Sequence, residues 1–485
     1  EARHRREQRH ALGGRRVQGP HPREFRGGRK DQPMFRWHHG PPLGLPRRDY
    51  DGPARRTRPG PEPVMVGEPA RLTDGLSGDD AHGRVAPNSK CMSCKRAWRM
   101  RNEMFKLRIG IVDTGIDLNI LTDFVDWTKV SQIVIWTFQE YESILKIDSL
   151  KKAVILPIDC LHLISGFETD FIIVSSTESN YELLSMGVSQ DKIIDLAAFS
   201  GMFIQRTSRK YTYLHGVSAA NCKFEVLVTG MSYAHSGYCP PTAAMKTAKL
   251  CYSGQDLFND FQLAKVFLNL TPFSAVRAAV VALSPYSFLY DMSLTSTGNH
   301  LNLFYYPVHR QLHNLKHADQ IESLIGEGLI RFFQSMRPAA GTELDLHNNG
   351  ELVLVSQIHV RSICDAKKSA SRWANKNYPD TEKETRSILI DYINLLKQRG
   401  IVPFVTVFPM SEYFMRWFDR KTMDQFHAAI NSVMLETSFE FVNLCESDAF
   451  DLDDFANIDH LNVRGAQKAT ALIEHRIKER LGLAS

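Results

Sequence analysis

The chain has 485 residues, of which 43% are hydrophobic, and a formal net charge of +5. This apolar content is sufficient for folded cores, and the length fits about three domains. No run of about 20 apolar residues occurs, so the sequence predicts no transmembrane segment. No charged-then-apolar secretory signal is present at the N-terminus either.

Residues 1–103 are rich in Arg, Gly, Pro and His and show no apolar periodicity. Such a segment cannot bury enough surface to offset the entropy of ordering it, so we predict a disordered basic tail. The net positive charge belongs to this tail, because acidic residues outnumber basic ones from Met104 onward. We expect the tail to have no folded role or to be sequence upstream of a start at Met104. The alternative is that it binds nucleic acid or an anionic membrane surface.

Eight cysteines are scattered along the chain, and only Cys91 and Cys94 form a Cys-x-x-Cys pair. A zinc site needs four ligands, and this pair has no second half at a suitable spacing. The other six are expected to be reduced residues of an intracellular protein. The sequence therefore favours a cytoplasmic location, with a peripheral membrane location as the alternative.

Residues 104–215 alternate short apolar runs with helix-like stretches, which is typical of a parallel α/β layer. The predicted strands are 107–112, 132–136 and 170–175. A dinucleotide site needs Gly-x-Gly-x-x-Gly after the first strand, and neither 112–115 nor 136–139 supplies it. We therefore expect a degenerate Rossmann-like domain with a structural or interaction role and no cofactor. The stretches 156–161, 170–176 and 185–194 resemble a nucleotide-sugar-type Rossmann-like domain found ahead of polysaccharide-modifying enzymes.

Residues 216–485 show the same alternation over a longer stretch. Strands are predicted at 223–228, 278–283, 351–358, 401–408 and 439–444, and helices at 257–268, 381–398, 422–436 and 464–481. The pattern predicts a parallel sheet covered by helices on both faces, with an insertion at 294–345 that covers the site. Active sites in such sheets lie beyond the carboxyl ends of the strands, where Ser232 and the loop after Leu444 fall.

Ser232 follows a buried-strand pattern, and His460 lies in a polar loop ahead of the last helix. A serine hydroxyl becomes nucleophilic when a base takes its proton, and an imidazole of near-neutral pKa is suited to that task. A glycine at 230 permits a tight exit from the strand. Taken singly, Ser232 could instead be an ordinary helix N-cap and His460 a surface residue. His235, one helical turn from Ser232, is expected to pack or hydrogen-bond beside the site.

Four stretches, 228–237, 253–257, 282–291 and 458–466, together resemble the SGNH or GDSL-like hydrolase superfamily. The likeness spans residues 222 to 480. It is closest to the bacterial branch associated with surface polysaccharides and with alanyl-transfer proteins of the cell wall. The resemblance implies a three-layer parallel-sheet domain with Ser232 as nucleophile and His460 as base. It also implies that the amides near Ser232 and Gly254 hold the oxyanion.

The resemblance further implies a serine esterase or O-acyl (acetyl) transferase that acts on a carbohydrate in surface polysaccharide modification. The alternative is a non-catalytic scaffold or carbohydrate-binding protein of the same fold, active in polysaccharide assembly. No nucleic-acid partner is expected, and the oligomeric state stays open.

Two positions depart from the family pattern. The acid usually lies three residues before the histidine, where this chain has Asn457, and Asp459 or Asp454 are the alternatives. An asparagine carbonyl can orient an imidazole but stabilises the imidazolium less than a carboxylate does. In the family, an asparagine in the third stretch normally donates to the oxyanion. In this chain the corresponding stretch, 282–291, has Ser284 to Tyr286 after its strand and no such asparagine. Both departures favour the non-catalytic alternative.

We predict no metal site. The histidines His300, His309, His313 and His317 lack the spacing of a ligand set, and no carboxylate obviously joins them in the sequence. The acidic run 446–454 lacks the glycine and terminal glutamate of an EF-hand loop and is predicted to be solvated.

Overall fold

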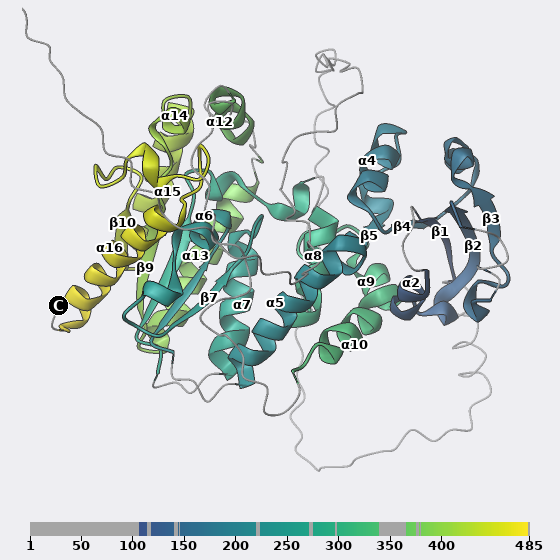
Figure 1. Cartoon of the computed structure of the whole chain (residues 1–485), viewed down its shortest axis with the longest axis horizontal. Helices are drawn as coiled ribbons and strands as arrows, with labels where there is room; N and C mark the ends of the chain where they lie inside the picture. The colour runs from purple at the N-terminus through teal and green to yellow at the C-terminus, as the bar shows by residue number, and fades with distance from the viewer. Residues whose placement is uncertain are drawn as a thin grey trace, which may run out of the picture. The chain divides into compact units, whose positions relative to one another are not determined.

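A computed structural model of the chain describes residues 106–113, 118–139, 144, 146–219, 224–270, 275–295, 298–338, 365–374, 378 and 380–483. The predicted tail at 1–103 and the predicted strand at 351–358 lie outside these residues. The described part is an α/β structure with two parallel five-stranded sheets (Figure 1), which confirms the predicted fold class at that level. Both sheets belong to one compact unit.

The first sheet has the strand order β3-β2-β1-β4-β5, and all its pairs are parallel. This is the order of the first five strands in a dinucleotide-binding doubly wound sheet. The strands are β1 (Leu107–Asp113), β2 (Val130–Thr137), β3 (Val154–Pro157), β4 (Phe171–Val174) and β5 (Ile193–Asp195). The helices of this part are α2 (Leu118–Phe124), α4 (Thr177–Ser185) and α5 (Gly201–Ala219).

The second sheet has the order β10-β9-β8-β6-β7, again with parallel pairs throughout. Its strands are β6 (Val226–Gly230), β7 (Thr247–Cys251), β8 (Ala278–Leu283), β9 (Val402–Val407) and β10 (Glu440–Asn443). From β6 the chain first moves outward to β7 and then returns to build β8, β9 and β10 on the other side. The direction of winding therefore reverses between β6 and β8. In open α/β sheets, ligands bind beyond the carboxyl ends of the strands at such a reversal.

The helices of the second sheet are amphipathic and form two packed groups. Helices α7 (Leu257–Leu270), α13 (Thr381–Gln398) and α15 (Arg420–Glu436) lie together, while the short α6 (Ser232–Gly237) packs against α16 (Val463–Leu481) (Figure 1). The four helix predictions for this region are confirmed to within two residues at each end. At the start of α16 the Asn462 side chain accepts a hydrogen bond from the Gly465 amide at 3.1 Å, which satisfies an otherwise free helix donor.

The predicted insertion forms helices α8 (Gly298–His309), α9 (Ala318–Ile321) and α10 (Glu327–Ser335), with a π-helical segment at Glu322–Gly326. Its α10 packs closely on the end of α2, because a Cβ at Gly328 would lie 2.3 Å from the carbonyl oxygen of Phe124, the last residue of α2. Two further helices, α12 (Ala366–Ala374) and α14 (Glu412–Met415), contact each other. Among the described residues, no helix is long and apolar enough to cross a membrane.

Candidate active site

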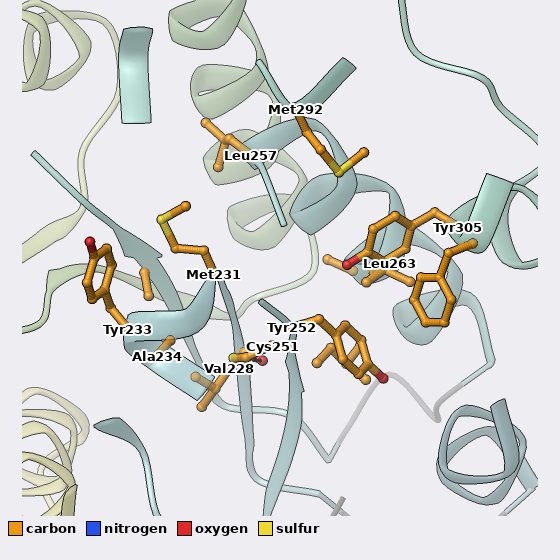
Figure 2. Packing of buried hydrophobic residues seen from close by; sticks show 14 of the residues in the cluster. Val228, Met231, Tyr233, Ala234, Cys251, Tyr252, Leu257, Leu263, Met292 and Tyr305 are labelled. Atoms are coloured by element: carbon orange, nitrogen blue, oxygen red, sulfur yellow. Dashed lines mark hydrogen bonds between the residues drawn. The ribbon is translucent and has the colours of Figure 1, made fainter. Parts of the chain in front are cut away.

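The turn after β6 is shaped by Gly230, which has φ +147°. A Cβ at this position would lie 2.7 Å from the Cβ of Ala282 on β8, so only glycine fits without displacement. Figure 2 shows Met231 and Tyr233 in this turn, with Val228 and Cys251 packed below it. Met231 is the N-cap of α6 and Ser232 is the first helical residue. The sequence-based alternative that Ser232 serves as the helix N-cap is therefore wrong.

The Ser232 hydroxyl faces the histidine predicted to be its partner. Ser232 Oγ and His460 Nε2 are 2.9 Å apart, although the two residues are 228 positions apart in the chain. Ser232 is half-buried, and the His460 side chain is 20% exposed, so both are accessible from solvent. The structure thus brings together the two residues that the sequence placed at opposite ends of one α/β domain.

The loop that carries His460 is folded around Asn457. The Asn457 Oδ1 atom accepts hydrogen bonds from the backbone amides of Asp459, at 3.0 Å, and His460, at 2.8 Å. Asn and Asp side chains commonly stabilise turns by accepting hydrogen bonds from backbone amides about two residues further on. The base of the loop is closed by a bridge between Phe455 and Leu461. This turn presents the Asp459 and His460 side chains together.

Two oxygen atoms lie within hydrogen-bonding reach of His460 Nδ1. Asp459 Oδ1 is at 2.9 Å and Asn457 Oδ1 is at 3.1 Å. The carboxylate is the stronger acceptor because it is charged, and the Asn457 oxygen already accepts two backbone hydrogen bonds. An ionised Asp459 holds the proton of a neutral imidazole on Nδ1, which leaves Nε2 free to accept a proton from Ser232.

Asp459 is a buried residue, at 9% exposure. Burial alone would raise its pKa, but the charge and hydrogen bond of His460, a hydrogen bond from Tyr233 and the charge of Arg372 lower it overall. The carboxylate form is therefore favoured despite burial. Adjacency to His460 in the chain does not prevent the contact, since the Asn457 turn supplies the bend that it requires.

Asp454, the third candidate acid, is held elsewhere. Its carboxylate pairs with Lys468 Nζ at 2.5 Å and with Arg464 Nε at 3.2 Å, and it takes part in a capping box with Asp451. Asp454 is also fully buried, which differs from the prediction of a solvated acidic run. Its role is to fix the loop onto the first turns of α16.

The carboxyl ends of β6 and β7 place the predicted oxyanion donors at one edge. Gly230 pairs with Cys251, and the Tyr252 amide donates to the Gly230 carbonyl oxygen at 3.2 Å. Gly254 follows in a tight turn with φ +79°, and its carbonyl oxygen accepts the Tyr290 hydroxyl at 2.9 Å. Within the described part of the chain, no acceptor is found for the amides of Ser232 and Gly254. Both amides are therefore available to a ligand.

The third stretch of the resemblance, 282–291, offers no side-chain amide. Ser284 is fully buried, and its hydroxyl lies 3.1 Å from that of Ser287. Two tyrosines that no sequence motif marks as functional lie here instead. The Tyr286 hydroxyl donates to the Tyr233 hydroxyl at 3.1 Å, and the latter lies 3.4 Å from Asp459 Oδ2.

Tyr233 also stacks on the His460 ring, with ring centroids 5.0 Å apart and an interplanar angle of 20°. Burial raises the pKa of its hydroxyl well above the ordinary value, so the group is a neutral donor to Asp459. No local signal marks this role in the sequence, because Tyr233 resembles any apolar helix residue.

Of the other histidines that the sequence singled out, His235 lies beside the site and the rest belong to the insertion. His235 Nδ1 lies 3.0 Å from the Cys251 carbonyl oxygen, beside the site and in accord with its predicted supporting role. In the insertion, His300 lies 3.7 Å from Asp195, His313 3.6 Å from Asp291 and His317 3.8 Å from Asp191. The expectation that no carboxylate joins this group is therefore wrong. The carboxylates come from distant segments of the chain, which the sequence spacing does not reveal.

Comparison with known proteins gives no match, either to a family model or to a curated protein.

Proposed function

We propose that the chain is an SGNH-type serine esterase or O-acyltransferase that acts on an acylated carbohydrate. The observation that carries the proposal is the contact of 2.9 Å between Ser232 Oγ and His460 Nε2, with Asp459 on the opposite ring nitrogen. This arrangement supports the proposal because it is the one expected for the nucleophile, base and orienting group of a serine hydrolase, which are recognised by geometry rather than by chain order. The carbohydrate, and its place in surface polysaccharide modification, rest on the sequence resemblance, as does the three-layer arrangement.

In the proposed reaction, Ser232 Oγ attacks the acyl carbonyl carbon while its proton moves to His460 Nε2. The amides of Ser232 and Gly254 hold the negative charge that develops on the carbonyl oxygen. The bond to the sugar oxygen then breaks, and His460 returns its proton to that oxygen. The acyl group stays on Ser232 as an ester.

The second half of the reaction releases the acyl group. Water or a sugar hydroxyl gives its proton to His460 and attacks the acyl-Ser232 ester, after which His460 reprotonates Ser232. Water makes the protein an esterase, and a sugar hydroxyl makes it a transferase. Asp459 stays ionised throughout and stabilises the imidazolium.

A fluorophosphonate probe tests the nucleophile without knowledge of the substrate. We expect the wild-type chain to be labelled and Ser232→Ala to lose the label. Ser236→Ala is the matched control, because Ser236 lies in the same helix, one turn further on. Peptide mapping of the adduct to any residue other than Ser232, or a folded wild type that takes no label, would contradict the proposal.

The second candidate is a non-catalytic carbohydrate-binding or scaffold protein with the same fold. The buried Ser284 at the position of the usual side-chain donor favours it. Its other sequence-based support, the asparagine at position 457, is weaker because Asp459 reaches the imidazole. Binding of acylated oligosaccharide by the Ser232→Ala variant and by wild type alike, with no turnover by either, would favour this candidate.

A further inference from the structure

Three ionisable side chains from distant parts of the chain converge beside α7. Asp256 and Asp291 follow β7 and β8, and His313 comes from the insertion. One ligand atom from each lies within 4.8 Å of the others. All three line a small cavity together with Tyr290, Thr381 and Glu384.

The imidazole of His313 is aimed into this cluster by its surroundings. Its ring stacks on Phe258, with centroids 3.9 Å apart, and its Nε2 atom is held by Glu384 at 3.1 Å. The side chain is 8% exposed, and its Nδ1 atom is buried with no hydrogen-bond partner among the described residues. A buried imidazole nitrogen without a partner calls for a ligand.

The spacing of the cluster suits a metal ion better than a hydrogen bond. His313 Nδ1 lies 3.6 Å from Asp291 Oδ1, which exceeds a normal hydrogen bond. Two ligands bound about 2.0–2.2 Å from one ion at a tetrahedral angle are about 3.4 Å apart. A divalent ion between the two atoms would therefore need only a small adjustment.

The two carboxylates are fixed by hydrogen bonds, and the basic side chain beside them is the imidazole of His313. Asp256 accepts hydrogen bonds from the Met292 amide, at 3.0 Å, and from Asn259 Nδ2, at 2.8 Å. Asp291 accepts from Asn314 Nδ2 at 2.9 Å. The carboxylates are 4% and 2% exposed, and no Lys or Arg of the described chain pairs with either. One imidazole can offset the charge of at most one of the two buried carboxylates, and a bound cation lowers the remaining cost of burying them.

We propose that Asp256, Asp291 and His313 bind a divalent transition-metal ion such as Zn²⁺ or Mn²⁺. One imidazole and two carboxylates favour these ions over Ca²⁺, which prefers oxygen ligands alone. Glu384, on the far nitrogen of His313, orients the ring as carboxylates commonly do for metal-bound histidines.

The bound ion would connect three segments, since Asp256 lies two residues after Gly254, Asp291 follows β8 and His313 belongs to the insertion. It would thereby fix the turn that carries Gly254. This consequence rests on the proposed function, because Gly254 is the proposed oxyanion donor. The binding itself does not, since it is measured without any ester substrate.

The test uses the full chain, freed of metal by a chelator and titrated with Zn²⁺, Mn²⁺ or Ca²⁺. We expect Zn²⁺ or Mn²⁺ to bind at the cluster and, at about 100 times its dissociation constant, to raise the Tm by roughly 5 °C. Asp291→Asn and His313→Gln should weaken that site more than about 100-fold, because loss of an outer partner alone costs about 10–100-fold. Glu384→Gln should weaken it about 10–100-fold. Its side chain is 43% exposed, so this variant is expected to fold.

Two controls separate this site from histidines and cysteines elsewhere. His317→Gln removes another histidine of the insertion with a carboxylate neighbour and should leave the affinity unchanged. Co²⁺ bound at the cluster should show ligand-field bands without a thiolate charge-transfer band, whereas binding at Cys91 and Cys94 would show one. The proposal is overturned if Asp291→Asn, His313→Gln and Glu384→Gln keep the wild-type affinity. It is equally overturned if no divalent ion changes the Tm of wild type.

Discussion

The role of Asp459 can be tested by replacing it with alanine. The carboxylate lies 2.9 Å from His460 Nδ1, with side-chain exposures of 12% and 20%. At an effective dielectric constant of about 20, two unit charges at this distance attract by about 6 kcal/mol. Partial solvent exposure reduces this value, and about 4 kcal/mol corresponds to a thousandfold change in rate. We therefore expect Asp459→Ala to slow fluorophosphonate labelling of Ser232 about a thousandfold.

The assay is the second-order rate constant for labelling, measured over time at fixed probe concentration. Asp448→Ala is the control, because Asp448 is an exposed acid of the same connection and should leave the rate unchanged. Circular dichroism shows whether each variant is folded. If Asp459→Ala labels within about threefold of wild type, the carboxylate does not stabilise the imidazolium and the assignment of the orienting group is wrong.

Two further predictions concern stability. Gly230→Ala should lower the free energy of unfolding by about 2–4 kcal/mol, since it combines a strained φ with a clash against Ala282, whereas Gly400→Ala should cost about 1 kcal/mol. Gly400 has φ +71° with open space around its Cβ position, and equal losses in urea unfolding would contradict the packing argument. Burial lowers the pKa of His309 from 6.5 to about 3. Between these values the unfolded chain binds a proton at His309 that the folded chain does not bind. The free energy of unfolding therefore falls as the pH drops below about 6.5. In the presence of a chelator, the change from pH 7 to pH 5 should therefore cost wild type about 2 kcal/mol more than His309→Gln, and equal losses would refute the burial argument.

Much of the fold could be predicted because the apolar runs are bounded by clear breaks. The strand at 278–283 is six buried apolar residues ahead of Ser284 and Pro285, and the structure has β8 over the same residues. Strand β7 was not predicted, because Lys249 interrupts its apolar run. In the structure the Lys249 ammonium is buried and donates to the carbonyl oxygens of His235, at 3.0 Å, and Tyr238, at 3.1 Å. The ammonium of Lys249 is hydrogen-bonded to carbonyl oxygens outside its own strand. The local sequence pattern does not show these partners, so it does not predict that the strand is fully buried.

The candidate site could be predicted only where local sequence carries its chemistry. The pattern at 226–232, a strand followed by a glycine and a serine, predicts a turn that carries a nucleophile. The polar loop around His460 predicts a base. The hydroxyl chain from Tyr286 through Tyr233 to Asp459 could not be found this way, since it joins positions 53 and 226 residues apart. The cluster of Asp256, Asp291 and His313 was missed for the same reason. Each residue stands in a different segment, and only the fold makes them neighbours.

Asn457 connects the sequence pattern to the structure in a way that can be tested by rescue. It stands where the SGNH-type hydrolases that the sequence resembles carry their acid, yet here it shapes the turn, and the carboxylate beside His460 Nδ1 belongs to Asp459. Its Oδ1 lies 3.1 Å from His460 Nδ1, and the residue is half-buried, so an aspartate can replace it without a large desolvation cost. We expect the double variant Asn457→Asp, Asp459→Ala to be labelled at least about tenfold faster than Asp459→Ala alone. The reason is that a carboxylate returns to the same ring nitrogen of His460. Asn457→Ala in that background should restore nothing and should lower the Tm, since two backbone amides lose their acceptor. If Asn457→Asp also restores nothing, position 457 contributes only the turn. A carboxylate then stabilises the imidazolium of His460 only from position 459.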